Sequence, residues 1–231
     1  MRPMKKMLRG ELDFYILVGI VLTVLLTSAF MFGGSMYSVR NIQSMAFQIP
    51  EFGFLALAMM LSNMIGGIDL SIIANANTVA IFAANVMNGT WSMGLVGPSR
   101  IILALFVAVL TALMFGLLNG IIVGKTSATS LIATLGTMTL IQGIGMAVTG
   151  GSSVGNIDPL FAEFGKSIFL GLPLIFWCFL MASLLLAVVI GFTSFGRRLY
   201  LFGGNPVVAR FSGINNEKMT ITVFLLTALL S

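Results

Sequence analysis

The chain has 231 residues, of which 58% are hydrophobic and only 8% are charged. A soluble domain carries about a quarter charged residues, so this chain lacks the polar groups needed to cover a water-exposed surface. The composition therefore excludes a soluble globular protein and indicates an integral membrane protein. With no histidine and one cysteine, metal sites of the Cys/His kind and disulfide frameworks are also excluded, and we expect no metal and no cofactor.

Apolar segments long enough to cross a bilayer recur along the whole chain. A spanning helix needs about 20 largely apolar residues, and the six candidate segments are 14–32, 42–65, 72–88, 100–123, 129–149 and 173–193. Pro50 and Glu51 interrupt the second segment, so we expect a break or kink there. The third is short and rich in asparagine, and a seventh begins near Met219. These segments predict an all-α polytopic membrane helix bundle, with residues 1–231 forming one transmembrane domain.

The basic residues predict the orientation of this bundle. If the N-terminus is cytoplasmic, nine basic residues lie inside and three outside, as the positive-inside rule requires. The segment 150–172 is then external and the segment 194–218 cytoplasmic. The inside set is Arg2, Lys5, Lys6, Arg9, Lys125, Arg197, Arg198, Arg210 and Lys218, and the outside set is Arg40, Arg100 and Lys166.

Asp69 is a carboxyl group between the second and third apolar segments. Burying a carboxylate at mid-bilayer depth costs about 2.5–3.5 kcal/mol, which indicates a functional role. Gly66 and Gly67 precede it and would let the backbone turn sharply. Asp69 could therefore be part of a hinge or line a solute pathway, or it could simply be the N-cap of the third span.

Polar residues form a stripe along the third apolar segment. Ser71, Asn75, Thr78 and Asn85 are spaced by four, three and seven residues, which places them on one helical face. Such a stripe either lines a wet pathway or hydrogen-bonds to neighbouring helices. The same alternatives hold for the polar face of the fifth segment. The residues predicted to line a substrate pathway are Asn63, Asp69, Ser71, Asn75, Thr78, Thr134 and Thr137.

Three glycines in the fourth segment predict a helix–helix contact. Gly116, Gly120 and Gly124 recur every four residues, so that another helix backbone could approach closely. The stretch Gly120–Thr126 resembles a phosphate-binding loop but is one residue short and follows a membrane span. Without histidine no nucleophile–base pair of the usual kind is available, so we expect a transporter with no catalytic residues rather than an enzyme.

Three sequence blocks occurring in the same order resemble a known family. Ile65–Ser71 reads IGGIDLS, Asn119–Gly120 is followed by the block Leu131–Met138, and Phe195–Pro206 leads into Ala209–Ile214. Together they resemble the signatures of permease subunits of ribose-type ABC importers, in the branched-chain amino acid/ribose permease family. The stretch after Ser71 and the residues before Leu131 depart from the usual pattern, which leaves the substrate open.

The resemblance implies the partners and a place in a larger assembly. It implies a second permease copy or paralogue, a cytoplasmic ATPase that hydrolyses ATP, and an extracytoplasmic binding protein that delivers a sugar. It places the chain in a bacterial inner membrane, in contact with lipid and not with nucleic acid. Members of the family are longer, so the resemblance also implies that the chain is incomplete at its C-terminus.

The segment Gly203–Ile214 is predicted to form a short cytoplasmic helix that docks onto the ATPase. Asn205 is a suitable N-cap with Pro206 at the first helical position, and Gly213 a suitable stop. An amphipathic helix lying on the lipid surface is the alternative. The docking residues are Gly204, Asn205, Pro206, Val207, Ala209, Arg210, Phe211, Ser212 and Gly213. The alternative function for the whole chain is an ion-coupled secondary transporter that uses Asp69.

Overall fold

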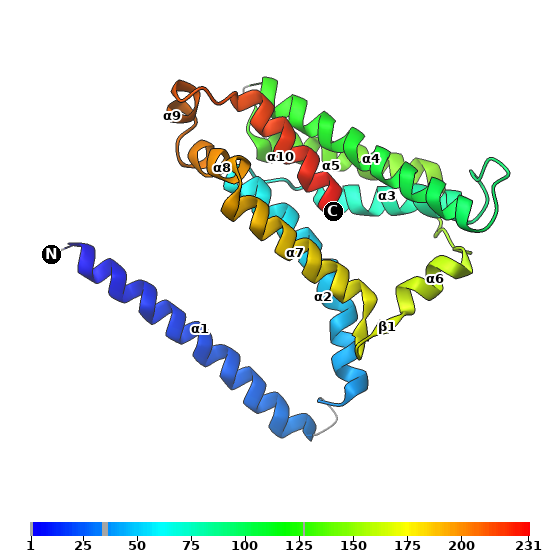
Figure 1. The fold of residues 1–231 in the computed structure, drawn as a ribbon, viewed down its shortest axis with the longest axis horizontal. Coiled ribbons are helices and arrows are strands. Elements are labelled where there is room, and N and C mark those ends of the chain that lie inside the picture. The colour runs from blue at the N-terminus through cyan, green and yellow to red at the C-terminus, as the bar shows by residue number, and fades with distance from the viewer. Residues whose placement is uncertain (1, 34–36, 127) are drawn as a thin grey trace. The chain divides into compact units, whose positions relative to one another are not determined.

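The computed structural model describes the backbone of residues 2–33, 37–126 and 128–231, and side chains from residue 15 onward within these ranges. It consists almost entirely of helices (Figure 1). The elements are α1 (Arg2–Phe32), α2 (Val39–Met64), α3 (Ile72–Met87), α4 (Pro98–Lys125), α5 (Ser130–Thr149), α6 (Pro159–Lys166), β1 (Ile168–Phe169), β2 (Leu172–Pro173), α7 (Leu174–Phe192), α8 (Ser194–Gly204), α9 (Pro206–Phe211) and α10 (Asn216–Leu230). The predicted all-α class is confirmed.

The chain divides into two units, Met1–Gln48 and Ile49–Ser231. The first unit contains α1 and the beginning of α2, and the second contains the rest of α2 and all later elements. Four of the nine basic residues predicted to be cytoplasmic belong to the first unit. Their side chains, those of Arg2, Lys5, Lys6 and Arg9, lie outside the described residues.

Five helices of the described chain are long and apolar enough to cross a membrane, namely α1, over its stretch Tyr15–Phe32, and α2, α4, α5 and α7. Each corresponds to a predicted span. The predicted third span is α3, which has 16 residues, and the beginning of the seventh is α10, with 15. Pro50 lies inside α2 without ending it, so the helix does not break there. Proline removes one backbone hydrogen bond, and a membrane helix tolerates that loss where neighbouring groups compensate.

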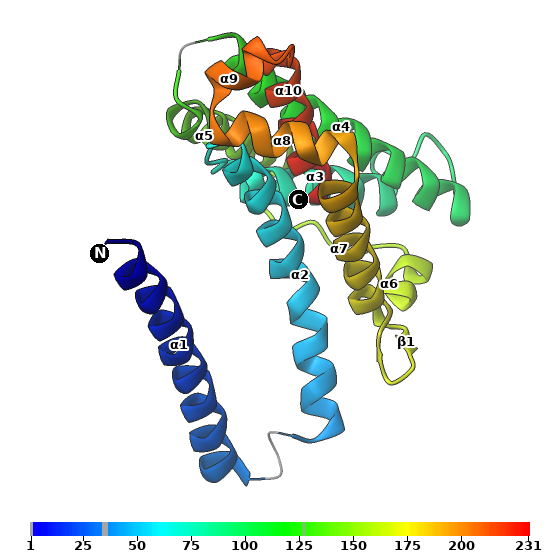
Figure 2. The same ribbon diagram turned by 60° about the vertical axis from the view of Figure 1, so that its left-hand side comes forward.

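The helices α3, α4, α5 and α10 lie side by side in Figure 1 and Figure 2, and α4 makes its most extensive contacts with α10. The glycine ridge of α4 forms this interface. A Cβ atom at Gly120 would lie 2.8 Å from the Cα of Ile221, and one at Gly116 would lie 2.6 Å from the Cβ of Ala228. The close helix contact expected from the four-residue spacing is thus confirmed, with α10 as the partner.

A second cluster joins the end of α2 to α7, α8, α9 and α10. Its buried side chains are Leu61, Ile190, Leu199, Phe202, Ala209, Met219 and Val223. Within it, a Cβ atom at Gly203 would overlap the carbonyl oxygen of Met64. The absence of a side chain at Gly203 therefore allows α8 to approach the end of α2.

The long segment between α5 and α7 has structure of its own. Asp158 is the N-cap of α6, and its Oδ1 accepts a hydrogen bond from the backbone nitrogen of Leu160 at 3.1 Å. β1 and β2 follow as a short antiparallel hairpin. The indole nitrogen of Trp177 donates to the carbonyl oxygen of Phe169 at 3.0 Å and ties this hairpin to α7.

Candidate functional site

The connection between α2 and α3 is held in place by two hydroxyl groups of α5. The Ser130 Oγ accepts a hydrogen bond from the backbone nitrogen of Ile68 at 3.0 Å. The Thr134 Oγ1 accepts from the nitrogen of Leu70 at 3.1 Å and lies 3.1 Å from the carbonyl oxygen of Ile68. Because these backbone groups lie in the connection between α2 and α3, outside either helix, the α5 hydroxyls supply hydrogen-bond partners that the apolar surroundings could not.

The two glycines before Asp69 have separate structural reasons. Gly66 has a φ of +74°, in the left-handed region that favours glycine. Gly67 lies against α5, where an added Cβ atom would stand 3.2 Å from the Ser130 Oγ. The pair thus turns the chain out of α2 and lets it pass close to α5.

Asp69 is only 2% exposed. Its Oδ1 accepts hydrogen bonds from the backbone nitrogen of Ser71 at 2.9 Å and from the Ser71 hydroxyl at 2.7 Å. The Thr227 hydroxyl of α10 lies 3.4 Å from Oδ2, and the Asn119 amide of α4 donates to the Ser71 Oγ at 2.6 Å. Side chains from α4 and α10 thus converge on this carboxyl group.

The alternative prediction, that Asp69 is the N-cap of the third span, is wrong. α3 begins at Ile72 and its N-cap residue is Ser71. Asp69 instead accepts from the backbone nitrogen two residues ahead, which is the hydrogen bond of an Asx-turn. The carboxyl group therefore shapes the turn into α3 from inside the protein.

The predicted polar stripe on α3 lies entirely on the buried side of the helix. The Asn75 amide donates to the carbonyl oxygen of Ala228 in α10 at 2.9 Å, and the Thr78 hydroxyl donates to that of Ile141 in α5 at 3.1 Å. Asn85 donates to Ile81 of its own helix at 2.9 Å. The stripe therefore joins α3 to its neighbours, and a role in a pathway stays a prediction.

The structure brings most of the predicted pathway residues together, with one exception. Asp69, Ser71 and Thr134 meet at the start of α3, and Asn75 and Thr78 follow on the next turns. Thr137 is buried and bonds the carbonyl oxygen of Thr134 within α5 at 3.2 Å. Asn63, in contrast, is exposed near the end of α2 and has no part in this cluster.

Asn119 belongs to this cluster but was not predicted to line the site. It is 2% exposed, and its Oδ1, like that of Asn75, is a buried acceptor without a hydrogen-bond donor among the described residues. A buried polar atom left unpaired costs about 1–3 kcal/mol. The sequence signal that could have identified Asn119 is that an amide side chain lies within a long apolar helix.

A separate pocket of about 330 Å³ opens between α2, α3, α7 and the end of α10 and contains three polar side chains, Glu51, Asn77 and Ser231. Glu51 and Asn77 are exposed. From the sequence, Glu51 was expected only to break or kink α2 together with Pro50. A carboxyl group halfway along a membrane helix costs about 2.5–3.5 kcal/mol to insert. This cost is the sequence signal by which Glu51 could have been predicted as a functional residue.

The short helix predicted after Gly203 is present as α9. The Asn205 Oδ1 caps it by accepting from the backbone nitrogens of Val207 and Val208 at 2.9 and 3.2 Å, with Pro206 in the first turn. Gly213 follows the helix with a φ of +82°. Gly204 ends α8 instead, and α8 itself was not predicted.

The α9 surface is partly apolar and partly basic. Phe211 is 89% exposed and Val207 63%, Arg210 is exposed beside them, and Ala209 is fully buried. The Asn216 amide donates to the carbonyl oxygen of Pro206 at 2.9 Å and so fixes α9 to the start of α10.

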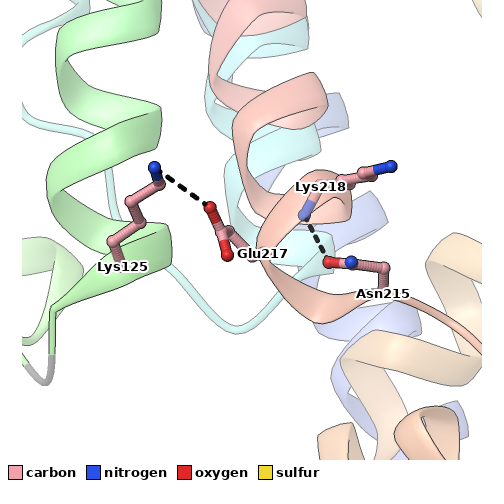
Figure 3. A network of polar contacts seen from close by, with 4 residues as sticks. All are labelled: Lys125, Asn215, Glu217 and Lys218. Atoms are coloured by element: carbon pink, nitrogen blue, oxygen red, sulfur yellow. Dashed lines mark hydrogen bonds and ion pairs between the residues drawn. The ribbon is translucent and has the colours of Figure 1, made fainter.

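The end of α4 meets the start of α10 close to α9. Figure 3 shows the Lys125 ammonium 3.5 Å from the Glu217 carboxylate, and the Asn215 Oδ1 accepting from the backbone nitrogen of Lys218 at 2.9 Å. Both side chains of the ion pair are about half exposed, so the pair adds little stability. The ion pair shows that the end of the α4–α10 pair nearest α9 is polar and charged.

A family model described as "Branched-chain amino acid transport system / permease component" matches residues 41–231. The match includes the Asp69 turn, the glycine ridge and α9. The chain belongs to this permease family.

Among curated relatives, the chain is 31% identical over 217 residues to "Ribose import permease protein RbsC" of Haemophilus influenzae, covering 92% of this chain and 64% of that protein. It is 31% identical over 194 residues to the protein of the same name from Bacillus subtilis, covering 83% and 58%. It is 26% identical over 212 residues to "L-arabinose transport system permease protein AraH" of Escherichia coli, covering 92% and 62%. This chain thus spans about three fifths of the length of these relatives. No solved structure matches it.

Proposed function

We propose that the chain is the membrane-spanning permease subunit of an ATP-binding-cassette importer, and that it passes a monosaccharide or a similar neutral polar solute into the cytoplasm. The observation that carries the proposal is the family match over residues 41–231, which spans both the Asp69 turn and α9. The printed names of the relatives, which concern ribose and L-arabinose, favour a pentose. This membership favours an ABC permease over an ion-coupled transporter that uses Asp69.

The partners follow from the same proposal. A second copy or a paralogue of the chain completes the pore, an ATPase subunit hydrolyses ATP in the cytoplasm, and an extracytoplasmic binding protein delivers the solute. The nine-to-three split of basic residues supports an inner-membrane orientation with the N-terminus in the cytoplasm. In this orientation α9 lies on the cytoplasmic side, where its exposed Phe211 and Arg210 suit a docking surface for the ATPase.

Transport by the complete set of subunits tests this function. Vesicles that contain the full-length permease, its ATPase and its binding protein should accumulate radiolabelled ribose or arabinose when ATP is present on the ATPase side. An ATPase variant that binds but does not hydrolyse ATP should abolish uptake. Uptake that survives this variant and collapses when ion gradients are dissipated would instead identify an ion-coupled transporter.

A further inference from the structure

Glu51 is an exposed carboxyl group in the middle of a membrane-spanning helix. It lies 12 residues after the start of α2 at Val39, or about 18 Å along the axis at about 1.5 Å per residue. No hydrogen bond or ion pair joins it to another of the described residues. A carboxyl group at this depth faces a watery space or a partner and not lipid tails.

The surroundings of Glu51 form one small pocket. It has a volume of about 330 Å³, and its other polar side chain in a helix interior is Asn77 of α3. Like the Glu51 side chain, the Asn77 side chain is exposed and makes no hydrogen bond to the other described residues. The pocket is lined by Pro50, Glu51, Phe52, Phe54, Leu55, Ile73, Ala76, Asn77, Ile175, Leu230 and Ser231.

α3 therefore carries polar groups on two sides with different surroundings. The Asn75 amide and the Thr78 hydroxyl are buried and donate hydrogen bonds to α10 and α5. Asn77 points to the pocket, where its amide is available. Asn77 is thus an exposed polar residue of α3 that lies apart from the buried stripe.

We propose that Glu51 and Asn77 form a hydroxyl-binding subsite on the translocation path, which takes a neutral polyol of pentose size; this proposal rests on the proposed function. A carboxyl group accepts hydrogen bonds from two neighbouring hydroxyls, and an amide both donates and accepts. The exposed ring of Phe52 supplies an apolar face for the C–H side of a sugar ring.

The lining also distinguishes a polyol from an amino acid. An amino acid would place its ammonium group near Glu51, and its carboxylate is bound most strongly by a cationic side chain. The described residues that line the pocket include no lysine or arginine. A polyol needs no such cation, because every one of its polar groups is satisfied by neutral or acidic hydrogen-bond partners.

Cysteine labelling tests the subsite in cells that carry the complete transporter. The native cysteine, Cys178, is first replaced by alanine, and L55C and A76C, which line the pocket beside Glu51 and Asn77, are then introduced separately. We expect both to react with a small membrane-impermeant thiol reagent. Ribose or arabinose at about ten times its Kd should slow labelling about tenfold, since the free fraction of the site falls in that proportion, whereas leucine should have no effect.

A control at matched depth is L184C, because Leu184 is 67% exposed in the middle of the apolar helix α7; it should not react. Three results would overturn the inference: no labelling at positions 55 and 76, labelling that sugar does not slow, or an L55C disulfide between two permease copies. The last would place this pocket at an interface.

Uptake by the charge-neutral variant gives an independent measurement. E51Q keeps the size of the side chain but removes the charged acceptor, and it should lower the uptake rate about tenfold or more. E163Q, on the exposed surface of α6, should leave uptake unchanged. If the C178A parent imports no sugar, the proposed function fails. If the parent imports sugar normally and E51Q equals it, only the subsite is wrong.

Discussion

The Asp69 carboxyl group accepts hydrogen bonds from both the nitrogen and the hydroxyl of Ser71, while Thr227 of α10 approaches its other oxygen. An asparagine side chain at this position keeps one oxygen that can accept from the Ser71 nitrogen, but it has no charge and turns its amide nitrogen toward a neighbour. The turn into α3 can therefore form, while the electrostatic field inside the bundle changes.

We expect D69N to reduce solute uptake at least about tenfold while membrane abundance stays within about twofold of wild type, since the main backbone acceptor survives. Uptake of the labelled solute and quantitative immunoblotting of membranes measure the two effects. D69A should lower both, because it leaves the Ser71 nitrogen without its acceptor.

A matched control for D69N is D158N at the start of α6, where asparagine also preserves the cap. It should leave uptake unchanged. Wild-type uptake by D69N at normal abundance would show that the charge of Asp69 has no part in transport.

At the scale of helices, the close contact of α4 with α10 depends on glycine. A methyl group at Gly120 would meet the Ile221 backbone at 2.8 Å. Backbone atoms cannot move aside without separating the two helices, so G120A should destabilise the protein by about 1–3 kcal/mol. Unfolding of the purified protein in mixed detergent micelles measures this loss.

The control for G120A is G136A on α5, where an added Cβ atom meets nothing within 4 Å. There the higher helix propensity of alanine should leave stability unchanged or raise it by up to about 1 kcal/mol. Equal effects of the two substitutions would mean that the α4–α10 contact does not depend on this glycine.

α9 is the second element that carries a prediction. If it docks onto the ATPase, F211A should lower ATP-driven uptake about tenfold or more while ATP hydrolysis continues, because an exposed aromatic anchor is lost from the interface. G213W should have the same effect, and it also strains a residue whose φ is +82°. Reconstituted vesicles with all subunits give both rates.

F192A is the control for F211A, since Phe192 at the end of α7 is 80% exposed and lies outside α9. It should not alter the ratio of transport to hydrolysis. Coupling that stays intact in F211A and G213W would favour the alternative, a helix that lies on the membrane surface.

At the scale of the whole molecule, the proposed orientation places Ser152 outside and Ser194 inside. Cysteines introduced at these positions in the C178A background should react differently with a membrane-impermeant thiol reagent. In intact cells the cysteine at 152 should be labelled, and the one at 194 should react only after the membrane is opened. Labelling with the opposite pattern would reverse the topology.

The sequence alone determined that this protein lies in a lipid bilayer, and it gave the approximate positions of most of its helices. The low share of charged residues indicates a lipid environment, and apolar runs of about 20 residues indicate helices that satisfy their own backbone there. Five spans could therefore be located from composition and length. Local signals also sufficed where the physics is local. Asn205, Pro206 and Gly213 define α9, and the spacing of the α4 glycines predicts a close contact.

Only the tertiary structure decided which residues meet. Nothing in the sequence shows that Thr134 reaches Leu70, 64 residues earlier, or that Thr227 reaches Asp69 from 158 residues away. The side of α3 that is buried, and the pocket shared by Glu51 and Asn77, also depend on how α3 is rotated against its neighbours. In an apolar chain almost every helix face is hydrophobic, so the pattern does not fix that rotation, and close packing and interhelical hydrogen bonds do.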